Sequence, residues 1–323
     1  MKLLIPGGAG YIGSHTVKNA LKKGYDVTIL DNFSTGHRWA TQDCEILEVD
    51  LLDKEKLSKL LKGRKFDAVI HFAAKSLVAE SFKSPEKYYK NNILGTINLV
   101  EQILKNDINK LVFSSSAAIY GNPSSEKISE VHPKKPINPY GRSKLYTENI
   151  LEDFTKSNEL KVICLRYFNA AGADPSGDIG EDHDPETHLI PNILNSVIHN
   201  KIVLEVFGDD YPTYDGTCIR DYIHVNDLAE AHILGIEKID KLKDFSALNL
   251  GNGNGFSIIE IIKSVERVIN TPVSYKVSQR RKGDPAVLVA DNSLSKKELG
   301  WQPDYESMDK IIETAYKWHM SLR

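Results

Sequence analysis

The chain is poor in several features that would direct its interpretation elsewhere. Among 323 residues there are only three cysteines, Cys44, Cys164 and Cys218, and such an odd, scattered set favours reduced thiols in a cytoplasmic setting over a disulfide framework. No apolar stretch approaches the roughly 18–20 residues of a membrane span. The formal charge is −3 and the pI is near 6.4, so neither nucleic acid nor an anionic membrane is favoured as a partner. We therefore expect a cytoplasmic protein that acts on a small molecule.

Glycine recurs at a regular interval directly after the first apolar run. Residues 2–5 are predicted to form a buried strand, and Gly7, Gly10 and Gly13 precede or open a helix predicted over 11–23. Glycines at such positions allow a tight turn and a close approach of the backbone to phosphate at the helix N-terminus. The pattern predicts a binding site for a dinucleotide pyrophosphate, although an ordinary tight turn shares this spacing.

An acidic residue stands where the adenosine ribose of such a cofactor should bind. The strand predicted over 26–30 ends at Asp31, 18 residues after Gly13. A carboxylate at that place would bind the ribose 2′-hydroxyl and repel a 2′-phosphate, which favours NAD over NADP. The nearby His37 and Arg38 leave NADP open as an alternative.

Strand and helix patterns alternate through the first half of the chain. We predict further strands at 46–49, 67–72, 110–115 and 161–167, and helices at 53–62, 85–106 and 140–157. This alternation predicts an α/β fold with a doubly wound parallel sheet, a Rossmann domain.

The pattern changes after Asn169. A stretch over 172–185 rich in Gly, Pro and Asp reads as a loop, and helices are predicted at 187–199, 227–238, 257–269 and 306–321 among short strands. We expect an NAD-binding domain over 1–170 and a smaller α/β C-terminal substrate lobe over 171–323, with segments near 220–250 able to return to the first domain.

The carboxyl ends of parallel strands meet the ligand in such sheets. The expected cofactor residues therefore lie in the Gly-rich turn, at strand ends and in the helices that follow them. They are Gly7, Gly10, Tyr11, Ile12, Gly13, Asp31, Asn32, Asp50, Leu51, Phe72, Ala73, Asn92, Tyr140, Lys144 and Phe168.

Tyr140 and Lys144 share one face of the helix predicted over 140–157. A free tyrosine has a pKa near 10, but a lysine cation and an oxidised nicotinamide nearby would favour the phenolate, and a ~3-unit decrease corresponds to about 4 kcal/mol. Ser116, at the end of the fifth strand, would share a hydrogen bond with the same substrate oxygen. Ser116, Tyr140 and Lys144 are the predicted catalytic residues, and a solvated helix-surface pair is the alternative for Tyr140 and Lys144.

Six segments together resemble the extended short-chain dehydrogenase/reductases, in the expected order over nearly the whole chain. They are residues 7–15, 114–121, 140–144, 166–172, 215–225 and 280–284. The resemblance implies a tightly held NAD that is reduced and re-oxidised within one turnover. It also implies 4-epimerisation of a UDP-hexose, between UDP-galactose and UDP-glucose, through a 4-keto sugar.

The resemblance also implies which residues hold the UDP-sugar. They are Ser116, Tyr140, Asn169, His188, Leu189, Phe207, Arg220, Arg281 and Asp284. Arginine forks suit phosphate oxygens, and ion pairing with Asp221 and Asp284 is the alternative for the two arginines. A homodimer is implied as well, through the helices predicted over 85–106 and 140–157, whose apolar stripes would equally fit packing on the sheet.

Two departures from the family pattern affect the expected site. Ser76 stands where some members have a lysine near the cofactor phosphates, so that contact is expected to be missing. Leu288 falls where some members place a bulky tyrosine against the sugar, and the smaller side chain predicts tolerance of N-acetylated sugars such as UDP-GalNAc.

The sequence argues against two related activities and leaves two other functions open. The resemblance implies that a dehydratase or decarboxylase needs an additional acid at the position where this chain has Ala117 and Ala118. The absence of that acid argues against both activities. An epimerase of UDP-glucuronate or UDP-xylose remains open, and so does a cofactor-sensing protein without chemistry.

The stretch 181–188 is rich in acidic residues and histidines, which raises the question of a metal. It lacks the i,i+4 histidine pair of a helical zinc site, so we expect a solvated loop and no metal.

Overall fold

The computed structural model describes residues 1–199, 203–281 and 284–322. Its largest element is a sheet of seven strands: β1 (Lys2–Pro6), β2 (Asp26–Asp31), β3 (Glu45–Glu48), β4 (Ala68–His71), β5 (Lys110–Ser116), β6 (Lys161–Tyr167) and β10 (Phe245–Leu250). The order is β10-β6-β5-β4-β1-β2-β3, and every neighbouring pair is parallel. The strand order reverses between β1 and β4, which confirms the predicted doubly wound sheet and places its switch point there.

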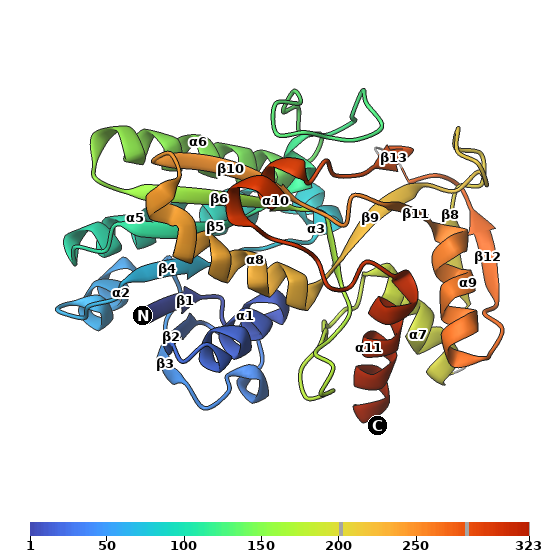
Figure 1. Ribbon diagram of the computed structural model, residues 1–323, viewed down its shortest axis with the longest axis horizontal. Helices are drawn as coiled ribbons and strands as arrows, with labels where there is room; N and C mark the ends of the chain where they lie inside the picture. Colours follow the sequence, from blue (N-terminus) through green and yellow to red (C-terminus); the bar gives the residue numbers. More distant parts are fainter. Residues whose placement is uncertain (200–202, 282–283, 323) are drawn as a thin grey trace.

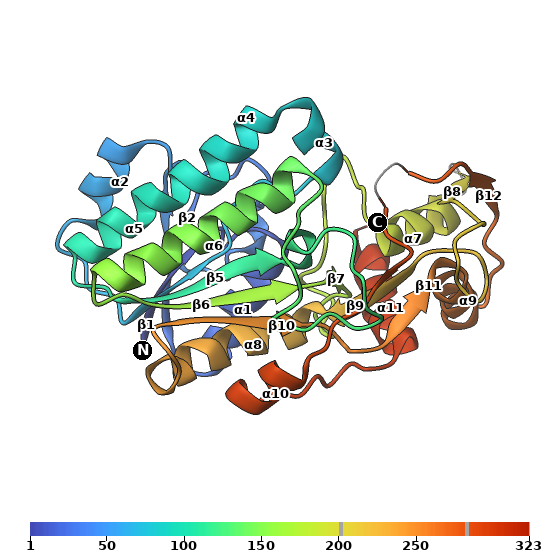
Figure 2. The same cartoon turned by 90° about the horizontal axis from the view of Figure 1, so that it is seen from above.

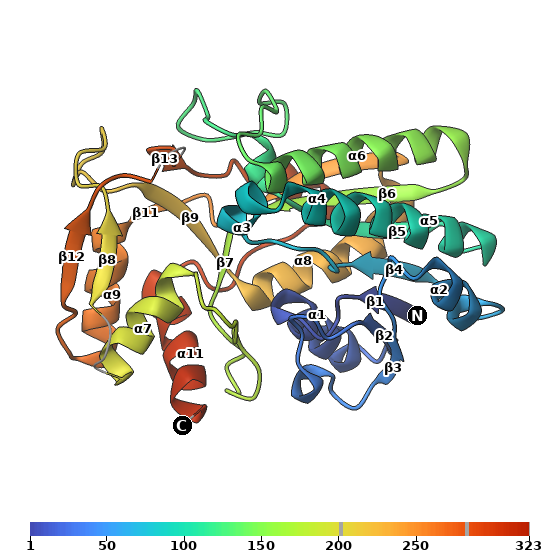
Figure 3. The ribbon, with the colours of Figure 1, turned by 180° about the vertical axis from the view of Figure 1, so that it is seen from behind.

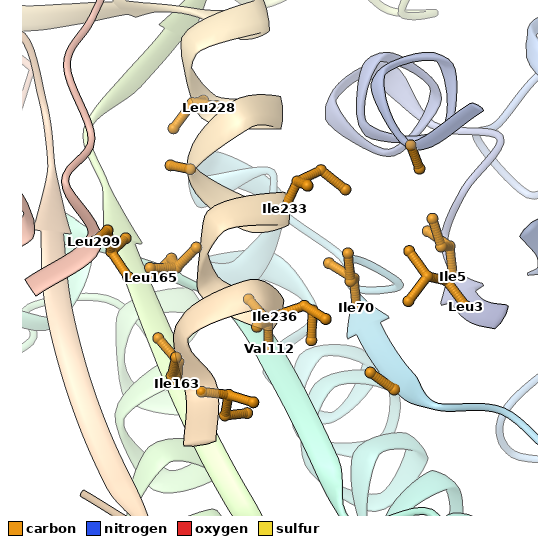
Figure 4. Close-up of a cluster of buried hydrophobic side chains, with 14 of the residues drawn as sticks. Leu3, Ile5, Ile70, Val112, Ile163, Leu165, Leu228, Ile233, Ile236 and Leu299 are labelled. Carbon is orange, nitrogen blue, oxygen red and sulfur yellow. The ribbon is translucent and has the colours of Figure 1, made fainter. Parts of the chain in front are cut away.

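Helices cover both faces of this sheet (Figures 1 and 2). One face is covered by α1 (Tyr11–Lys22) and α8 (Val225–Lys238), and the other by α2 (Lys54–Leu61), α5 (Gly95–Lys105) and α6 (Pro139–Ser157). Because both faces are covered, the strands are continuous apolar runs, and Leu3, Leu4 and Ile5 are fully buried. Figure 4 shows Ile233 and Ile236 of α8 packed over strand residues such as Val112.

The chain returns to this sheet after residue 171. Helix α8 packs against α1 and the strands, and β10 pairs with β6 in parallel, from Phe245 opposite Val162 to Leu250 opposite Tyr167. Residues 225–250 therefore belong in space with the large sheet, as the sequence allowed for segments near 220–250.

The remaining elements form a smaller lobe beyond the carboxyl ends of the strands (Figure 3). It contains a sheet of β7 (Asn169–Ala171), β9 (Ile219–His224), β11 (Gly255–Ser257) and β13 (Val287–Leu288), and a parallel pair, β8 (Leu204–Phe207) with β12 (Tyr275–Ser278). Helices α7 (Leu189–His199), α9 (Ile258–Ile269) and α11 (Met308–Ser321) enclose its apolar core. A capping box between Ser257 and Glu260 fixes the start of α9.

The helix predicted over 85–106 is one continuous segment with three geometries. It begins as α4 (Pro85–Tyr88), passes through a π-helical stretch η2 (Tyr89–Leu94) and ends as α5. The short helices α3 (Val78–Lys83) and α10 (Ser293–Leu299) were not predicted. No helix within the described residues is both long and apolar enough to cross a membrane.

Candidate active site

A cavity of about 1260 Å³ lies between the carboxyl edge of the large sheet and the smaller lobe. Its walls come from the β1–α1 turn, the ends of β2, β4 and β5, the start of α6, and β9. Usual small-molecule pockets span roughly 300–1,000 Å³, so this cavity has room for more than one ligand.

The structure brings almost all of the predicted site residues to this one cavity. The cofactor residues among them are Gly7, Gly10, Tyr11, Ile12, Gly13, Asp31, Asn32, Asp50, Leu51, Phe72, Ala73, Tyr140, Lys144 and Phe168. The substrate residues are Ser116, Asn169, His188, Leu189, Phe207, Arg220, Arg281 and Asp284, with Leu288 beside them. Lys282 and Gly283, of the matching segment 280–284, lie outside the described residues.

The Gly-rich turn shows which glycines the protein itself requires. A Cβ on Gly7 would lie 2.4 Å from the backbone nitrogen of Ala73, and one on Gly13 would lie 2.1 Å from the carbonyl oxygen of Gly7. A Cβ on Gly10 would meet no protein atom closer than 3.4 Å. Protein packing therefore does not explain Gly10, which faces the cavity and opens α1 without a side-chain cap. Close approach of a pyrophosphate to the helix N-terminus does explain it, so the turn fits a dinucleotide.

Asp31 is held rigidly at the end of β2. Its carboxylate accepts hydrogen bonds from the backbone N–H groups of Ala9 at 3.0 Å and Phe33 at 2.9 Å. Burial raises the pKa of Asp31 while these hydrogen bonds oppose the increase. Arg38, which left NADP open, forms an exposed ion pair with Glu48 instead of facing Asp31.

The predicted catalytic residues are positioned by the junction of β5 and α6. Asn138 caps α6 by accepting from the backbone N–H of Gly141 at 2.7 Å. A Cβ on Gly141 would lie 2.4 Å from the carbonyl oxygen of Ala118, so the glycine lets α6 approach the end of β5. This close approach places Tyr140 beside Ser116, with which it shares a hydrogen bond.

Lys144 lies one turn further along α6. Its Nζ donates to the carbonyl oxygen of Ser114 at 2.6 Å and lies 6.0 Å from the centre of the Tyr140 ring. Burial lowers the pKa of Lys144 to about 7. The solvated-pair alternative is wrong, because both side chains are buried.

The predicted decrease in the pKa of Tyr140 depends on a bound, oxidised nicotinamide as well as on Lys144. Burial raises the pKa of Tyr140 above its usual value of 10.0, and the hydrogen bond with Ser116 opposes this only in part. Desolvation of the phenolate is the main cause of this increase, and the predicted decrease stays a prediction for the site with NAD bound.

Asn92 is the one predicted residue that lies behind the cavity wall. Its side chain accepts from the backbone N–H of Lys75 at 2.8 Å and donates to the Lys75 carbonyl oxygen at 3.0 Å and to Ser143 Oγ at 2.9 Å. Asn92 thus ties the loop after β4 to α6, and it does not itself line the cavity.

The ion-pair alternative for the two arginines on the substrate side holds for Arg220 with Asp284 but not for Asp221. Arg220 Nη2 is 4.0 Å from Asp284, and the guanidinium of Arg281 lies 3.9 Å above the ring of Phe207. Asp221 turns away and accepts backbone hydrogen bonds from Asn252, Gly253 and Ala290. Both arginines line the cavity, and Arg220 Nη1 donates to the carbonyl oxygen of Ile219 at 2.9 Å.

Lys75 is a cavity residue that the sequence analysis missed. It lines the cavity and its Nζ donates to Ser34 Oγ at 2.9 Å. A cation therefore reaches the cofactor side from the position before Ser76, where it was expected to be missing. The signal was its place directly after the Ala73-Ala74 pair that follows the fourth strand.

We expected the acidic and histidine-rich loop to be solvated, but it is partly buried. Glu181 is buried, and one ligand atom from each of Glu181, His183, Glu186 and His188 lies within 4.8 Å of the others. The sequence argument considered only histidine pairs on a helix, whereas these residues converge from a loop.

A family model decides the relationship. The model described as the NAD dependent epimerase/dehydratase family matches residues 3–251, most of the chain. The chain belongs to this family. NAD is therefore its cofactor, which confirms the prediction from Asp31 and the Gly-rich turn.

Several proteins similar to this chain in sequence and structure are named for an epimerase activity. A UDP-glucose 4-epimerase of Lactobacillus helveticus is 48% identical over 322 residues, 99% of this chain and 98% of that protein. The UDP-glucose 4-epimerase of Brucella ovis in complex with NAD is 46% identical with a TM-score of 0.94, covering 98% of this chain and 97% of the other. A UDP-Glc/GlcNAc 4-epimerase of Campylobacter jejuni is 41% identical with a TM-score of 0.87, covering 99% of each.

Proposed function

We propose that the protein catalyses the 4-epimerisation of UDP-hexoses, interconverting UDP-galactose and UDP-glucose with the same NAD retained throughout. The observation that carries this proposal is a buried Ser116–Tyr140–Lys144 group on a cavity large enough for a dinucleotide and a nucleotide sugar together. Full-length relatives that are named UDP-glucose 4-epimerase support it.

The residues around the Gly-rich turn hold the cofactor. Gly10 admits the pyrophosphate, the open N–H groups at the start of α1 bind it, and Asp31 binds the adenosine ribose. Bound NAD supplies a hydride acceptor that takes the hydrogen from C4 of the sugar and returns it to the opposite face.

Tyr140 moves the proton in this reaction. Its phenolate oxygen takes the proton of the sugar 4-hydroxyl and later returns a proton to the 4-keto oxygen. Ser116 donates a hydrogen bond to that oxygen as it becomes a carbonyl, and Lys144 favours the phenolate through its charge. Because burial alone raises the pKa of Tyr140, the phenolate forms mainly when positive charge is next to it.

The substrate anchors lie on the lobe side of the cavity. Arg220 and Arg281 bind the diphosphate, whose two charges suit their forks, and Phe207 lies beside the uracil. This anchoring leaves the hexose free to turn about its bond to the diphosphate, so that either face of the keto sugar can be presented.

A rate assay with UDP-galactose tests the proposal. Purified protein with no added NAD should convert UDP-galactose to UDP-glucose. UDP-glucuronate and UDP-xylose form matched arms, because C6 recognition is the open point of specificity. The proposal would be contradicted if only UDP-glucuronate or only UDP-xylose were turned over. It would also be contradicted if no sugar were turned over even with added NAD.

The sugar range extends to N-acetylated hexoses in this proposal. Leu288 lines the cavity in β13, paired opposite Arg220 of β9, and its side chain leaves room beside C2 of the sugar. UDP-GalNAc should therefore be turned over at a measurable rate, and Leu288→Tyr should reduce that rate more than the rate with UDP-galactose. No turnover of UDP-GalNAc by the unmutated protein would refute this.

The proposed assembly is a homodimer formed along α6 and the α4–η2–α5 segment, which run side by side in Figure 2. Leu94 of η2 and Tyr146 of α6 are 47% and 46% exposed. A second copy would cover these side chains. Sedimentation should report a dimer for the intact protein and a monomer for Leu94→Glu.

The proposed setting is the cytoplasm, supported by three cysteines that are all free. We propose that residues 1–170 bind NAD and that residues 171–323 bind the UDP-sugar. Residues 225–250 belong to the second range but pack on the NAD-binding domain.

A further inference from the structure

Four potential metal ligands converge on the loop between β7 and α7. One ligand atom from each of Glu181, His183, Glu186 and His188 lies within 4.8 Å of the other three. In a tetrahedral site with bonds of about 2.0–2.2 Å, ligand atoms are roughly 3.3–3.6 Å apart. Side-chain adjustments of about 1 Å would therefore complete such a site around an ion.

Hydrogen bonding alone is a poor explanation for this arrangement. His183 and His188 both direct Nδ1 at the same oxygen, Oε1 of Glu181, the first from 3.1 Å and the second in close contact. Two ring nitrogens thus compete for one carboxylate oxygen. Glu186 Oε2 is 3.7 Å from His183 Nδ1, too far for a hydrogen bond. A divalent cation would accept a lone pair from each of the four groups at once.

The surroundings hold the ligands in these positions. The side chain of Glu181 is only 4% exposed, and its carbonyl oxygen accepts from Trp318 Nε1 at 2.8 Å. Glu186 Oε1 accepts from the backbone N–H groups of Thr187 and His188 at 2.7 and 2.8 Å, which leaves Oε2 facing the cluster. Such outer contacts are what orient metal ligands.

We propose that Glu181, His183, Glu186 and His188 form a structural Zn²⁺ site. Two imidazole nitrogens with two carboxylate oxygens suit zinc, whereas Mg²⁺ and Ca²⁺ prefer oxygen ligands alone. Four protein ligands close the coordination sphere, as in structural sites, and two carboxylates neutralise the ion.

The position of the site explains what the ion would do. The ring of His183 packs edge-on against Tyr11, the first residue of α1, with ring centres 6.2 Å apart. Glu181 is bound by Trp318 of α11. The ion would pin this loop between the NAD-binding helix α1 and the helix α11 of the smaller lobe. The ion would supply no chemistry, but all four ligands also line the cavity, and His188 would bind the ion in place of the UDP-sugar contact expected from the sequence.

Metal titration of the intact chain tests this inference. Protein treated with EDTA and dialysed should bind one Zn²⁺ per chain when titrated with ZnCl₂ by calorimetry, and its Tm should rise, while MgCl₂ should do neither. His183→Gln and Glu186→Gln should each lower zinc affinity more than tenfold, because loss of even an outer-shell partner costs roughly 10–100-fold. The matched control His132→Gln, on a distant loop, should bind zinc like the unmutated protein.

Other outcomes would overturn the inference. No zinc binding by the unmutated chain would leave only an ion-paired cluster, and unchanged affinity in both variants would place the ion elsewhere. Should a variant fail to fold, Co²⁺ in the unmutated chain decides. The intense visible absorption of four-coordinate cobalt is expected, and the weak bands of six-coordinate cobalt would contradict the site.

Discussion

At the scale of single residues, the chemistry depends on how a buried phenol acquires charge. Burial raises the pKa of Tyr140, and Lys144, whose pKa falls to about 7, is only partly charged near neutral pH. Neither group is therefore strongly ionised by the protein alone. In the proposed reaction, Tyr140 becomes an effective base only when NAD is bound, because the oxidised nicotinamide adds a positive charge beside the phenol.

Replacing Tyr140 tests this residue directly. Tyr140→Phe should lower UDP-galactose turnover by on the order of 10²–10⁴-fold, because general acid–base catalysis contributes about that much. Bound NAD should be unchanged, which absorbance of the purified protein measures. The exposed Tyr275→Phe is the matched control and should keep full activity. A variant at Tyr140 with normal turnover would favour a protein that binds NAD without chemistry.

The sequence predicted residues whose role depends on neighbours a few positions away. It missed residues whose role depends on segments that are far apart in the chain and meet only in the fold. Gly7, Gly10 and Gly13 are readable because a turn needs them within a few residues. Asn92 was expected at the cofactor, but its partners Lys75 and Ser143 lie 17 and 51 residues away. Local patterns do not show such a network, nor the meeting of four ligands on a loop.

At the scale of elements, the β1–α1 turn has two kinds of glycine. Gly13 touches the backbone of Gly7, whereas Gly10 faces the cavity. Gly13→Ala should therefore lower the Tm of the chain even after NAD is removed. Gly10→Ala should keep the Tm of the NAD-free chain but retain less NAD, because its methyl group occupies the path of the pyrophosphate.

Thermal denaturation and NAD content, measured on both variants, check this contrast. Equal Tm losses in the NAD-free variants would mean that both glycines serve packing. Full NAD retention by Gly10→Ala would remove the argument that the cavity side of the turn binds phosphate.

The π-helical geometry of η2 could not be predicted from the sequence. The pattern over 85–106 predicts one regular helix, and only its geometry at 89–94 differs. The carbonyl oxygen of Asn92 accepts from Thr96 at 2.7 Å and from Thr147 of α6 at 3.2 Å. The second contact comes from another helix, so packing against α6 accompanies the irregularity, as is common near functional sites.

At the scale of the whole molecule, the alternation of strands and helices was enough to predict the sheet, since right-handed crossovers leave few topologies. The return of β10 to the edge beside β6 was only allowed for, because a six-residue apolar strand fits either lobe equally well.

Buried histidines predict how the stability of the whole molecule depends on pH. Burial lowers the pKa of His15 and His232 to about 4, and that of His71 and His224 to about 3. Between pH 6.5 and these values the unfolded chain binds protons that the folded chain does not. Stability is therefore unaffected by these groups above pH 6.5 and decreases as the pH falls below it.

His15→Gln isolates one of these groups. At pH 5 the difference between the pKa of His15 in the unfolded and in the folded chain corresponds to about 2 kcal/mol of unfolding free energy. The unmutated chain should lose this amount between pH 7 and pH 5, and the His15→Gln variant should not. Denaturant unfolding with EDTA present at both pH values measures this without a metal contribution. The exposed His199→Gln should keep the full pH dependence, and an equal loss in His15→Gln would contradict the account.

The central claim is that the hydrogen at C4 leaves the sugar and returns to it within one cavity that is closed to exchange. The most direct measurement is to convert UDP-galactose to UDP-glucose in D₂O with no added NAD and examine C4 of the product by NMR. The account predicts ordinary hydrogen at C4, because only the hydroxyl proton passes through Tyr140. Deuterium at C4 would mean that the hydrogen is lost as a proton, and would contradict the proposed reaction.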